Sequence, residues 1–451
     1  MDLEGLRLAL LGFGVENRAL GHWLATRGLT FTVCDCDPEV RVDDPPWDGA
    51  VEDWRLGKAA MAGLGDFDLL FRSPGIPVRS PELVAARQQG IRLSSGIDLF
   101  LRHCPARILG VTGTKGKGTT ASLLLAILEA DGIAAHVGGN IGTPPVSFLD
   151  RLQADDLVVL ELSSFQLQDL GQSPPGAILL PVTTDHLDYH ETRAEYVEAK
   201  GEICRHQTPE GWVLAAADCP TALDLAATTA GRRLAFSATS AIEGDGCWVD
   251  AGQIWWRQNG ANARAIASTS DVCIRGKHNL GNACAAVAAS LLAGASDQAA
   301  AKGLVTFTGL PHRLEEVTER DGVLYVNDSL ATTPAAAVAG LWAWPDRRVV
   351  LIAGGSPKGV DFTDLGGAIA ADVVALVTIG QEGARIVQAA RAAGFSGPVD
   401  EDCATMAEAV GAAARRAATG DVVLLSPACA SFGMFSSYAD RGEAFRRAVK
   451  G

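Results

Sequence analysis

One segment constrains the fold of this chain more than any other: an apolar run that leads into a glycine-rich loop and then into a leucine-rich helical pattern. The run is Ile108–Thr112, the loop reads Gly113-Thr114-Lys115-Gly116-Lys117-Gly118-Thr119-Thr120, and the helical pattern covers Ala121–Asp131. A strand, a tight glycine loop and a helix in this order are typical of a parallel α/β sheet. The segment therefore predicts an α/β fold.

The same loop has the composition of a phosphate-binding site. Glycines let backbone N–H groups approach phosphate oxygens, the helix N-terminus favours negative charge, and Lys117 offers a cation to the outer phosphates. Gly118 stands where Ser or Thr usually follows the lysine, so we expect the Thr119 hydroxyl to ligate the Mg²⁺ that accompanies ATP. A merely tight turn is the weaker interpretation. The loop predicts binding of a nucleoside triphosphate.

Similar apolar runs, each followed by a glycine-rich turn and a helical stretch, recur along the chain. Continuous rather than alternating runs are typical of strands buried on both faces of parallel sheets. The clearest strand candidates are Leu8–Leu11, Ile108–Thr112, Leu157–Leu162, Ala177–Val182, Val323–Asn327, Val349–Ala353, Val373–Ile379 and Val422–Leu425. We expect alanine-rich helices such as Ala283–Ala293 to cover these sheets.

The series of strands and helices stops and restarts twice, near Ser94-Ser95-Gly96 and near Gly309-Leu310-Pro311. We therefore expect three domains: a Rossmann-like domain over residues 1–96, a central P-loop domain over 97–311, and a second Rossmann-like domain over 312–451. The pattern loosens between Trp212 and Cys273, which predicts a smaller, more antiparallel part within the central domain.

Charge and cysteine usage narrow the class of protein. Among 451 residues, 38 Lys and Arg stand against 53 Asp and Glu, and the resulting net charge of −15 disfavours a general nucleic-acid binder. The ten cysteines are scattered without a CxxC pair, as expected for thiols in a reducing compartment. The sequence has neither a signal-peptide pattern nor an apolar run of about 20 residues. We expect a cytoplasmic, monomeric protein without a membrane span.

The N-terminal run Leu8–Leu11 ends in Gly12-Phe13-Gly14, the beginning of a dinucleotide-binding fingerprint. Asn17 stands at the third glycine position, and Asp35, after the next apparent strand, is the only acidic partner. A plain turn and a ligand site are about equally compatible with this incomplete pattern. If the turn binds a ligand, a nucleotide-like group other than NAD is compatible with it.

Polar residues also follow two central strands. Glu161 lies at the end of one run, where a carboxylate can hold a metal ion near phosphates. Asp185, His186 and His190 follow the next run. Two histidines four residues apart suggest zinc, but no suitable third ligand stands out, so hydrogen-bonded loop residues are the favoured interpretation. Lys200 lies in a helical pattern, in which a lysine normally faces solvent.

In their order along the chain, these segments resemble the Mur ligase family, ATP-dependent enzymes that form amide bonds in peptidoglycan synthesis. The resemblance extends over essentially the whole chain and is greatest to members that add D-glutamate to UDP-N-acetylmuramoyl-L-alanine. Besides the glycine-rich loop, the segments that carry it are Ser73–Pro77, Gly96–Phe100, Gly139–Gly142, Glu161–Leu167, Gly276–Asn279 with Asn282, Leu310–Arg313, Asn327–Ser329 and Ser426–Ser431.

The resemblance implies a site for ATP and two Mg²⁺ ions. It implies that residues 113–120 bind the ATP phosphates, and that Asn282, Arg313 and Asp328 contact adenine, phosphate and ribose. Thr119 would ligate the first Mg²⁺, and Glu161 and His186 would help to hold the second. Lys200 matches a family lysine that is carbamylated, which converts an ammonium into an anion that orients the metal. The catalytic set is thus Lys117, Glu161, His186 and Lys200.

The same resemblance implies how the two organic substrates bind. The UDP-linked substrate is expected to contact Gly12, Phe13, Gly14, Asp35, Ser73, Asn140 and Ser163. The incoming glutamate is expected at Thr332, Lys358, Ser431 and Tyr438, where the Lys358 ammonium offers a counter-charge to the side-chain carboxylate.

Several positions depart from the family pattern and leave alternatives open. Leu330 occupies a place where many D-glutamate-adding members have Lys, Tyr438 stands where Phe is common, and Phe432 follows Ser431. Addition of L-glutamate is therefore an alternative to addition of D-glutamate. The Gly118-Thr119 pair is similar to the corresponding loop of folylpolyglutamate synthases, so a ligase of that kind is a further alternative. A Rossmann dehydrogenase and an ATP-binding regulator without turnover are the remaining alternatives.

Overall fold

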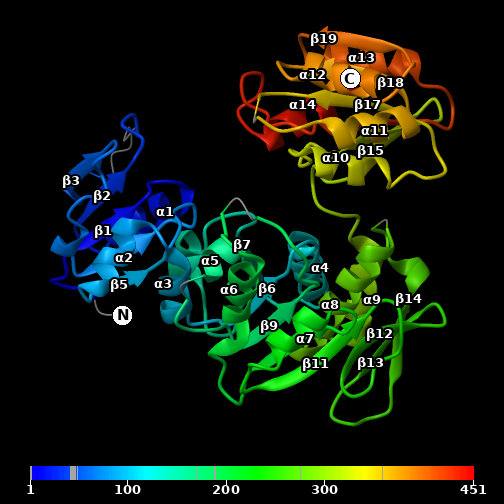
Figure 1. The fold of residues 1–451 in the computed structure, drawn as a ribbon. Coiled ribbons are helices and arrows are strands. Elements are labelled where there is room, and N and C mark those ends of the chain that lie inside the picture. Colours follow the sequence, from blue (N-terminus) through cyan, green and yellow to red (C-terminus); the bar gives the residue numbers. More distant parts are fainter. Residues whose placement is uncertain are drawn as a thin grey trace. The chain divides into compact units, whose positions relative to one another are not determined.

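The computed structural model describes residues 3–40, 47, 49–168, 170–186, 189–274, 276–357 and 359–451 (Figure 1). The chain divides into two compact units. Unit 1 consists of Met1–Cys273 and Lys277–Phe307, and unit 2 consists of Ile274–Gly276 and Thr308–Gly451. Within the described residues, the strands form two sheets in unit 1 and one sheet in unit 2.

The first sheet of unit 1 is parallel, with the strand order β3-β2-β1-β4-β5. Its elements are β1 (Leu8–Leu11), α1 (Val15–Ala25), β2 (Phe31–Asp35), β3 (Val51–Leu56), the 3-10 helix η2 (Leu64–Asp66), β4 (Leu69–Arg72), α2 (Pro81–Gln88) and β5 (Arg92–Ser94). Because β2 and β4 lie on opposite sides of β1, the loops after β1 and β4 meet at the carboxyl edge of the sheet. Ligands of open α/β sheets bind at such a point.

Asn17 holds this edge together. Its side chain is buried, and Nδ2 donates to the carbonyl oxygens of Leu11 at 2.9 Å, Gly12 at 2.8 Å and Phe71 at 3.2 Å. A glycine at this third fingerprint position could make none of these bonds. Asn17 therefore joins the ends of β1 and β4, which gives the departure from the fingerprint a structural reason.

The second sheet of unit 1 has the strand order β14-β13-β12-β11-β10-β9-β6-β8-β7. Its strands are β6 (Arg107–Thr112), β7 (Ala135–Gly139), β8 (Leu157–Glu161), β9 (Gly176–Leu179), β10 (Trp212–Ala216), β11 (Arg232–Ser237), β12 (Gly246–Asp250), β13 (Gln253–Arg257) and β14 (Arg264–Ser268). The helices of this part are α3 (Gly96–His103), α4 (Lys117–Ala130), η3 (Pro145–Arg151), α5 (Ser164–Leu167), α6 (Arg193–Arg205), α7 (Pro220–Ala226), η4 (Thr269–Asp271), α8 (Lys277–Ala293) and α9 (Asp297–Thr306).

The antiparallel part of this sheet is smaller than the prediction for Trp212–Cys273. Strands β10 and β11 pair in parallel, because α7 forms a crossover between them, and only β12, β13 and β14 pair antiparallel. Helices α4 and α8 begin earlier than Ala121 and Ala283, the predicted starts. In α4, residues 117–120 carry the end of the glycine-rich loop, so the leucine-rich pattern starts one turn after the helix does.

The sheet of unit 2 has the strand order β15-β16-β20-β17-β18-β19, and only β15 pairs antiparallel. Its elements are β15 (Glu315–Arg320), β16 (Val323–Asn327), α10 (Pro334–Leu341), β17 (Val349–Gly354), α11 (Thr363–Asp372), β18 (Val373–Ile379), α12 (Gly383–Ala392), β19 (Val399–Cys403), α13 (Met406–Arg416), β20 (Val422–Leu425) and α14 (Tyr438–Lys450).

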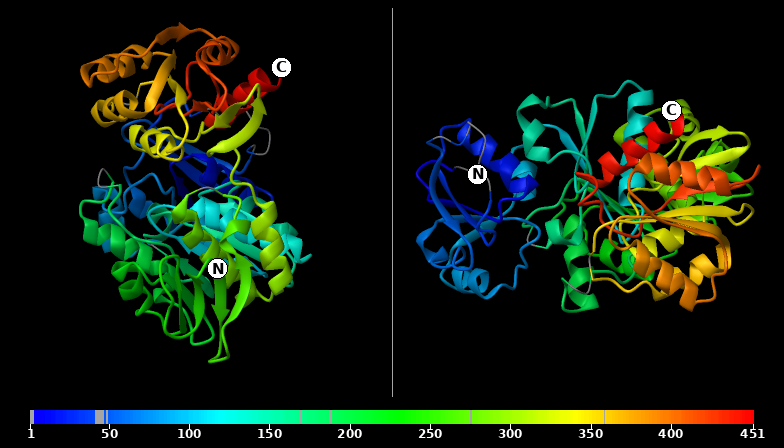
Figure 2. Two further views of the ribbon diagram at one scale, coloured as in Figure 1. Left: turned by 90° about the vertical axis from the view of Figure 1, so that its right-hand side faces the viewer. Right: turned by 90° about the horizontal axis from the view of Figure 1, so that it is seen from above.

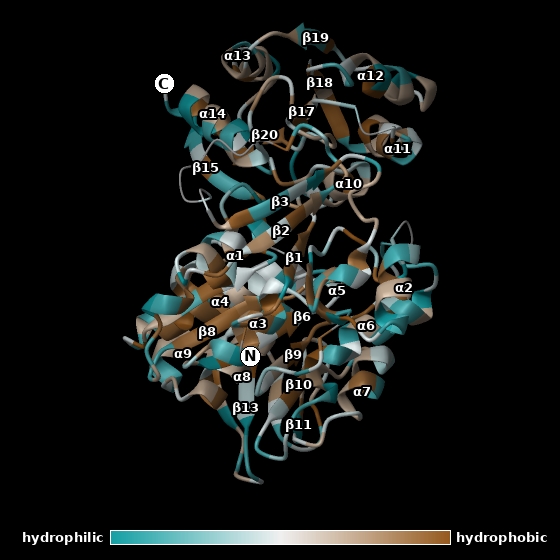
Figure 3. Cartoon of the chain, turned by 90° about the vertical axis from the view of Figure 1, so that its left-hand side faces the viewer, coloured by the Kyte–Doolittle hydropathy of each residue, from teal (hydrophilic) through white to brown (hydrophobic). Residues whose placement is uncertain are grey.

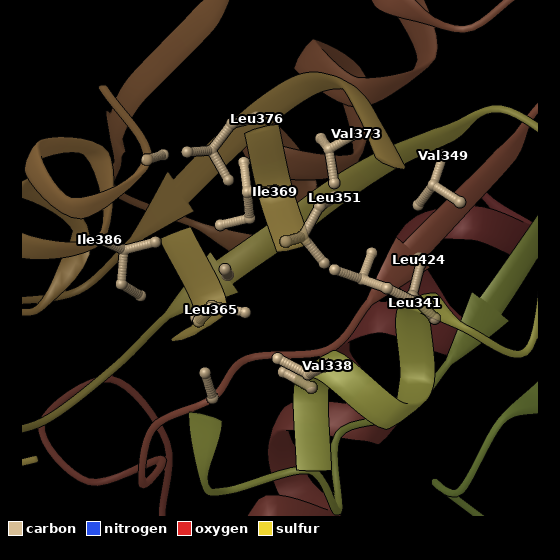
Figure 4. Packing of buried hydrophobic residues seen from close by; sticks show 14 of the residues in the cluster. Val338, Leu341, Val349, Leu351, Leu365, Ile369, Val373, Leu376, Ile386 and Leu424 are labelled. Atoms are coloured by element: carbon tan, nitrogen blue, oxygen red, sulfur yellow. The ribbon is translucent and has the colours of Figure 1, made fainter. Parts of the chain in front are cut away.

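Both faces of this sheet are covered by helices (Figures 1 and 2). Leu351 and Leu424 point into one core, with side chains of α10, α11 and α12 (Figure 4). Their neighbours Val350 and Val423 point into the other core, with side chains of α13 and α14. In unit 1, Figure 3 shows hydrophobic strands β6, β8 and β9 and a largely hydrophilic helix α2. The expected α/β fold with buried parallel strands is confirmed, whereas the exact domain boundaries stay predictions.

None of the helices in the described ranges is long and apolar enough to cross a membrane.

Two leucines on helices of unit 1 test the assignment of the core. Leu124 on α4 is fully buried, whereas Leu223 on α7 is 42% exposed. We expect Leu124→Ala to lower the free energy of unfolding by about 2–5 kcal/mol, because it removes buried methyl groups and leaves a cavity. Leu223→Ala should change it by less than about 0.5 kcal/mol. Chemical denaturation followed by tryptophan fluorescence measures both values, and equal losses would contradict the described core.

Candidate functional site

The glycine-rich loop after β6 depends on two glycines with positive φ angles. Gly113 has φ of 154° and Gly116 has φ of 89°, values that other residues adopt only with strain. A Cβ atom on Gly116 would also collide with the side-chain amide of Asn282, and one on Gly113 would collide with Leu180. Both positions therefore require glycine for two independent reasons.

Two lysines donate to the same carbonyl oxygen of this loop. Lys117, the first residue of α4, donates from Nζ to the carbonyl oxygens of Gly113 at 3.2 Å and Thr114 at 3.1 Å. Lys200 on α6 donates from Nζ to the Gly113 carbonyl at 2.8 Å and to Thr112 Oγ1 at 3.4 Å. The two ammonium groups therefore meet at the point where the strand ends and the loop begins.

Lys200 is 1% exposed, so the expectation from its helical pattern, that it faces solvent, is wrong. Its pKa is lowered to about 7, first by burial and then by the charge of Lys117, while Asp185 and Glu161 act in the opposite direction. At neutral pH a substantial fraction of this amine is therefore uncharged, unlike that of an ordinary lysine.

Tyr196 lies one helical turn before Lys200 and contacts both the lysine and the loop. Its ring centre is 4.7 Å from Lys200 Nζ, and its hydroxyl lies 2.9 Å from Thr114 Oγ1. The Thr114 hydroxyl also accepts from the N–H of Thr183 at 2.9 Å. Sequence reasoning missed Tyr196, although its spacing of four residues from Lys200 could have indicated a shared helix face.

The remaining loop residues separate into an exposed and a buried group. Lys115 is exposed, whereas Gly118, Thr119 and Thr120 are buried at the start of α4. The Thr120 hydroxyl donates to Asn282 Oδ1 at 3.3 Å, and Asn282 Nδ2 donates to Asn279 Oδ1 at 2.7 Å. Asn282, predicted to contact adenine, is thus packed against Gly116 and Thr120 of the loop. Its contact with adenine stays a prediction.

Glu161 and Asn140 meet at the carboxyl ends of β7 and β8. Asn140 Nδ2 donates to Glu161 Oε1 at 2.9 Å, and the N–H of Asn140 donates to the Glu161 carbonyl at 2.8 Å. The Glu161 side chain is largely buried, and its negative charge opposes the lowering of the Lys200 pKa. This arrangement leaves carboxylate lone pairs with which Glu161 can bind a cation.

His186 and His190 occupy different environments. His186 is exposed, has φ of 54°, and lies beside Phe165 with a distance of 4.9 Å between ring centres. His190 is buried, and its Nε2 lies 2.9 Å from the Ser164 hydroxyl, so the hydrogen-bonded interpretation is confirmed for it. Within the ranges that the structure covers, no three His, Cys, Asp or Glu side chains form a metal-binding group. The metal-binding role of His186 stays a prediction.

The N-terminal turn is closed by residues of three segments. Gly12 has φ of 73°, and a Cβ atom there would lie 3.0 Å from Ser73 Cβ, so the loops after β1 and β4 are in close contact. The N–H of Phe13 donates to Asp35 Oδ2 at 2.6 Å, which ties the turn to the end of β2. Gly14 is exposed next to open space. The structure thus brings together Gly12, Phe13, Asp35 and Ser73, four of the residues predicted for the UDP-linked substrate.

Ser163 begins α5 with a capping box. Its hydroxyl accepts from the N–H of Gln166 at 3.3 Å, and Gln166 Oε1 accepts from the N–H of Ser163 at 2.9 Å. The Gln166 Nε2 group donates to Glu16 Oε1 on α1 at 2.6 Å. A residue of helix α1 therefore supports the segment that follows β8.

In unit 2, Asp328 lies at the carboxyl end of β16 and is buried. It accepts from the Ser426 hydroxyl at 2.7 Å and from the N–H of Leu314 at 3.2 Å. Burial raises the pKa of Asp328 to about 7, while Ser426, the Leu314 N–H and the charge of Arg313 act in the opposite direction. Arg313 itself is exposed. Their predicted contacts with the nucleotide stay predictions.

The residues predicted to bind the amino acid lie on neighbouring segments of unit 2. Thr332 is half-buried before α10, Ser431 is buried after β20, and Tyr438 is the 43% exposed first residue of α14. Lys358 lies outside the described residues. The Ser329 hydroxyl donates to the Tyr438 carbonyl at 2.7 Å, which joins the end of β16 to α14.

Sequence reasoning missed Arg441, which is fully buried in α14. Its guanidinium donates to the hydroxyl and carbonyl of Ser329 and to the carbonyl oxygens of Cys429 and Ala430, at 2.9–3.2 Å. Burial lowers its pKa to about 10. Arg441 thus holds together the segments that follow β16 and β20. A single arginine in an amphipathic helix carries no sequence signal for such burial.

Two family models match most of the chain. Residues 111–290 match the Mur ligase middle domain, and residues 312–429 match the Mur ligase glutamate ligase domain. The chain is 42% identical to the UDP-N-acetylmuramoylalanine–D-glutamate ligase of Symbiobacterium thermophilum over 98% of both chains.

Two solved structures from Thermotoga maritima share the fold. UDP-N-acetylmuramate–alanine ligase has a TM-score of 0.60 and 16% identity, and covers 99% of both chains. A MurF ligase in complex with ADP has a TM-score of 0.54 and 17% identity, and covers 100% of this chain and 97% of its own.

The crowding at Gly116 can be separated from its backbone strain by a matched pair of substitutions. Gly116 and Gly132 both have positive φ angles, but a Cβ atom on Gly132 would meet nothing within 4 Å. Because Gly116→Ala must displace Asn282 and the loop N–H groups, we expect it to weaken ATP binding at least about tenfold. Gly132→Ala should carry a similar strain, about 1–2 kcal/mol, with unchanged ATP affinity. Isothermal titration calorimetry measures both affinities, and equal affinities would contradict the assignment.

Proposed function

The chain belongs to the Mur ligase family of ATP-dependent ligases, and from this premise we propose that it adds D-glutamate to UDP-N-acetylmuramoyl-L-alanine. The proposal is supported by the name of the Symbiobacterium relative, which aligns with nearly the whole chain. The observation that carries it is the meeting of Lys117, Lys200 and the glycine-rich loop beside Glu161. This site has the groups that activation of a carboxylate by ATP requires.

We propose that the loop binds the phosphates of ATP. The N-terminus of α4 and the N–H groups of the loop favour anions, and the Lys117 ammonium can exchange its carbonyl partners for phosphate oxygens. These groups would neutralise the charge that accumulates when a carboxylate attacks the terminal phosphate. The products of this step would be ADP and an acyl phosphate of the alanyl carboxyl group.

The donor set fits Mg²⁺, which commonly binds to one or two carboxylates together with phosphates and water. Thr119 and Glu161 would hold such ions, and we propose two of them, with His186 as a further ligand. When bound, Mg²⁺ supplies Lewis-acid stabilisation of the phosphoryl oxygens. Glu161 retains lone pairs for this role because Asn140 donates only one side-chain hydrogen bond to its carboxylate.

The second step would be attack of the glutamate amine on the acyl phosphate. A new C–N bond forms through a tetrahedral intermediate, the C–O bond to phosphate breaks, and inorganic phosphate leaves while the amine loses a proton. We propose that Thr332, Ser431, Tyr438 and Lys358 bind the amino acid, and that Arg313 and Asp328 contact the nucleotide. The neighbourhood of Asp328, Ser329 and Tyr438 in unit 2 supports the grouping of these residues.

At the other end of the substrate, we propose that the turn at Gly12–Gly14 binds the UDP group. The location of this turn at the switch point of the first sheet supports the proposal. Asp35 would act partly by holding the N–H of Phe13. Ser73, Asn140 and Ser163 complete the proposed contacts. The cytoplasmic location and the monomeric state stay predictions.

The main test is phosphate release from Mg·ATP with UDP-N-acetylmuramoyl-L-alanine and D-glutamate, L-glutamate or no amino acid. We expect turnover with D-glutamate alone. Turnover with L-glutamate alone would assign the chain to the alternative specificity, with Leu330 and Tyr438 as the first positions to mutate. No turnover with either, in protein that binds ATP, would contradict the proposal.

Lys117 and Lys302 provide a matched pair for the same assay. Lys117→Met should lower kcat at least about a hundredfold, because it removes a cation aimed at the developing charge. Lys302 is exposed on α9, outside the glycine-rich loop, so Lys302→Met should leave kcat nearly unchanged.

We propose that Lys200 is carbamylated, because only an uncharged amine adds to CO₂ and the pKa of this amine is lowered to about 7. Protein incubated with ¹³C-bicarbonate should show a carbamate NMR signal that grows as the pH rises through about 7. The sign follows from the lowered pKa: above it the amine is neutral, and below it the ammonium cannot react. The signal should be lost in Lys200→Met and retained in Lys302→Met, which removes an exposed lysine. A wild-type spectrum without a signal that depends on Lys200 would contradict the proposal.

A further inference from the structure

A fully buried arginine ends β4 and directly precedes Ser73. Arg72 is 1% exposed and is among the largest fully buried side chains of the chain. Burying a guanidinium is unfavourable unless its N–H groups are satisfied. The partners of Arg72 therefore identify what this charge is retained to hold.

One set of partners is the loop that Arg72 itself begins. Its Nη1 donates to the carbonyl oxygens of Ser73 at 3.3 Å, Pro74 at 3.3 Å and Ile76 at 2.6 Å. This loop packs directly on the N-terminal turn, since a Cβ atom on Gly12 would lie 3.0 Å from Ser73 Cβ and 3.2 Å from Ile76 Cδ1. Arg72 thus fixes the segment that forms one wall of the turn.

The other set of partners lies in α5 and in the loop after β9. Nη2 donates to the carbonyl oxygen of Phe165 at 2.7 Å, and Nη1 donates to the hydroxyl of Tyr189 at 3.2 Å. The Tyr189 hydroxyl also lies 3.0 Å from the carbonyl oxygens of both Pro74 and Ile76. The Phe165 ring contacts Tyr189 and His186, with ring-centre distances of 4.2 Å and 4.9 Å.

A second connection runs parallel to this one. Glu16 on α1, four residues after Gly12, accepts from Gln166 at 2.6 Å, and Gln166 holds Ser163 in its capping box. Burial raises the pKa of Glu16, and the positive charge of Arg72 partly opposes this rise. Both connections therefore join the N-terminal part of the chain to the segment after β8, and the connection through Arg72 also reaches the loop after β9.

We propose that Arg72 is a positioning residue that couples the N-terminal turn to the loops of Ser163 and His186. Binding of the uridine nucleotide at the turn would then help to order the groups that act on the alanyl carboxylate. The planar guanidinium suits this role, because Nη1 donates to the loop after β4 while Nη2 donates to α5. The inference rests on the proposed function, in which the turn binds UDP and His186 helps to bind Mg²⁺.

Because the two terminal nitrogens of Arg72 have different partners, substitutions of Arg72 can separate the effect on UDP affinity from the effect on the KM for Mg²⁺. Arg72→Met removes every donor, so we expect about tenfold weaker UDP binding and a severalfold higher KM for Mg²⁺. Arg72→Lys keeps one donating nitrogen, which can replace Nη1 but cannot reach the Phe165 carbonyl as well. We therefore expect R72K to recover UDP affinity and to retain the raised KM for Mg²⁺. The affinity for Mg·ATP alone should stay within about twofold of wild type in both variants, because neither change touches the glycine-rich loop.

Arg102→Met serves as the control for general destabilisation. Arg102 pairs with the buried Asp98 at 3.0 Å, so its loss leaves a buried carboxylate without its cation, away from the connections of Arg72. We expect R102M to lower Tm without a change in UDP affinity or in KM for Mg²⁺. UDP binding is measured by calorimetry, KM by phosphate release and Tm by thermal unfolding, for all variants and the wild type.

The results distinguish the coupling from the function on which it rests. Wild-type protein that fails to bind UDP would overturn the proposed function itself. Wild-type protein that binds UDP, with R72K recovering both parameters or neither, would overturn the coupling. The same conclusion follows if R72M and R102M change UDP affinity and KM equally. If R72M does not fold, the split between UDP affinity and KM in R72K decides the matter.

Discussion

Strands that are buried on both faces can offer polar groups to a ligand only at their ends, and this constraint organises the whole chain. In unit 2, alternate residues of β17 and β20 point into two separate cores, and Asp328 and Ser426 follow directly at the carboxyl ends of their strands. In unit 1, the glycine-rich loop follows β6, Glu161 ends β8 and the Gly12 turn follows β1. These candidate site residues therefore lie where parallel strands end, whereas Lys200 and Asn282 reach the glycine-rich loop from helices.

Two lysine side chains lie close together at the glycine-rich loop, and this proximity affects the chemistry available to Lys200. Two ammonium groups share the Gly113 carbonyl oxygen, and their repulsion together with burial disfavours the charged form of Lys200. Conversion of Lys200 into a carbamate would replace this repulsion with attraction toward Lys117 and would add an anion beside Glu161. The buried carboxyl of Asp328 shows the complementary situation in unit 2, since its ionised form is stabilised by only a few neighbours. In both cases burial disfavours the charged form of the group.

The sequence allowed the central strands to be predicted almost residue by residue, because their apolar runs are continuous, as in β1, β16 and β18. It did not allow the prediction of β3 or β19, whose residues are largely polar and only partly buried. Local motifs identified Lys117 and Gly116 from spacing alone. Residues with distant hydrogen-bond partners were missed: Tyr196 contacts Thr114, and Arg72 contacts Phe165 and Tyr189. Periodicity describes which face of an element is apolar, but not which polar side chain is buried against another loop.

The amide of Asn17 has a consequence for attempts to redesign the N-terminal turn. The substitution Asn17→Gly would complete the sequence pattern of a dinucleotide-binding fingerprint. It would also leave the carbonyl oxygens of Leu11, Gly12 and Phe71 without the donor that they share. The Leu11 carbonyl would keep its bond from the N–H of Ser73 at 2.9 Å, but any buried acceptor that is left unsatisfied costs about 1–3 kcal/mol. A route from this turn to a NAD-binding turn therefore passes through a less stable intermediate. Other hydrogen bonds between the ends of β1 and β4 would have to replace those of Asn17 before the ligand could be changed.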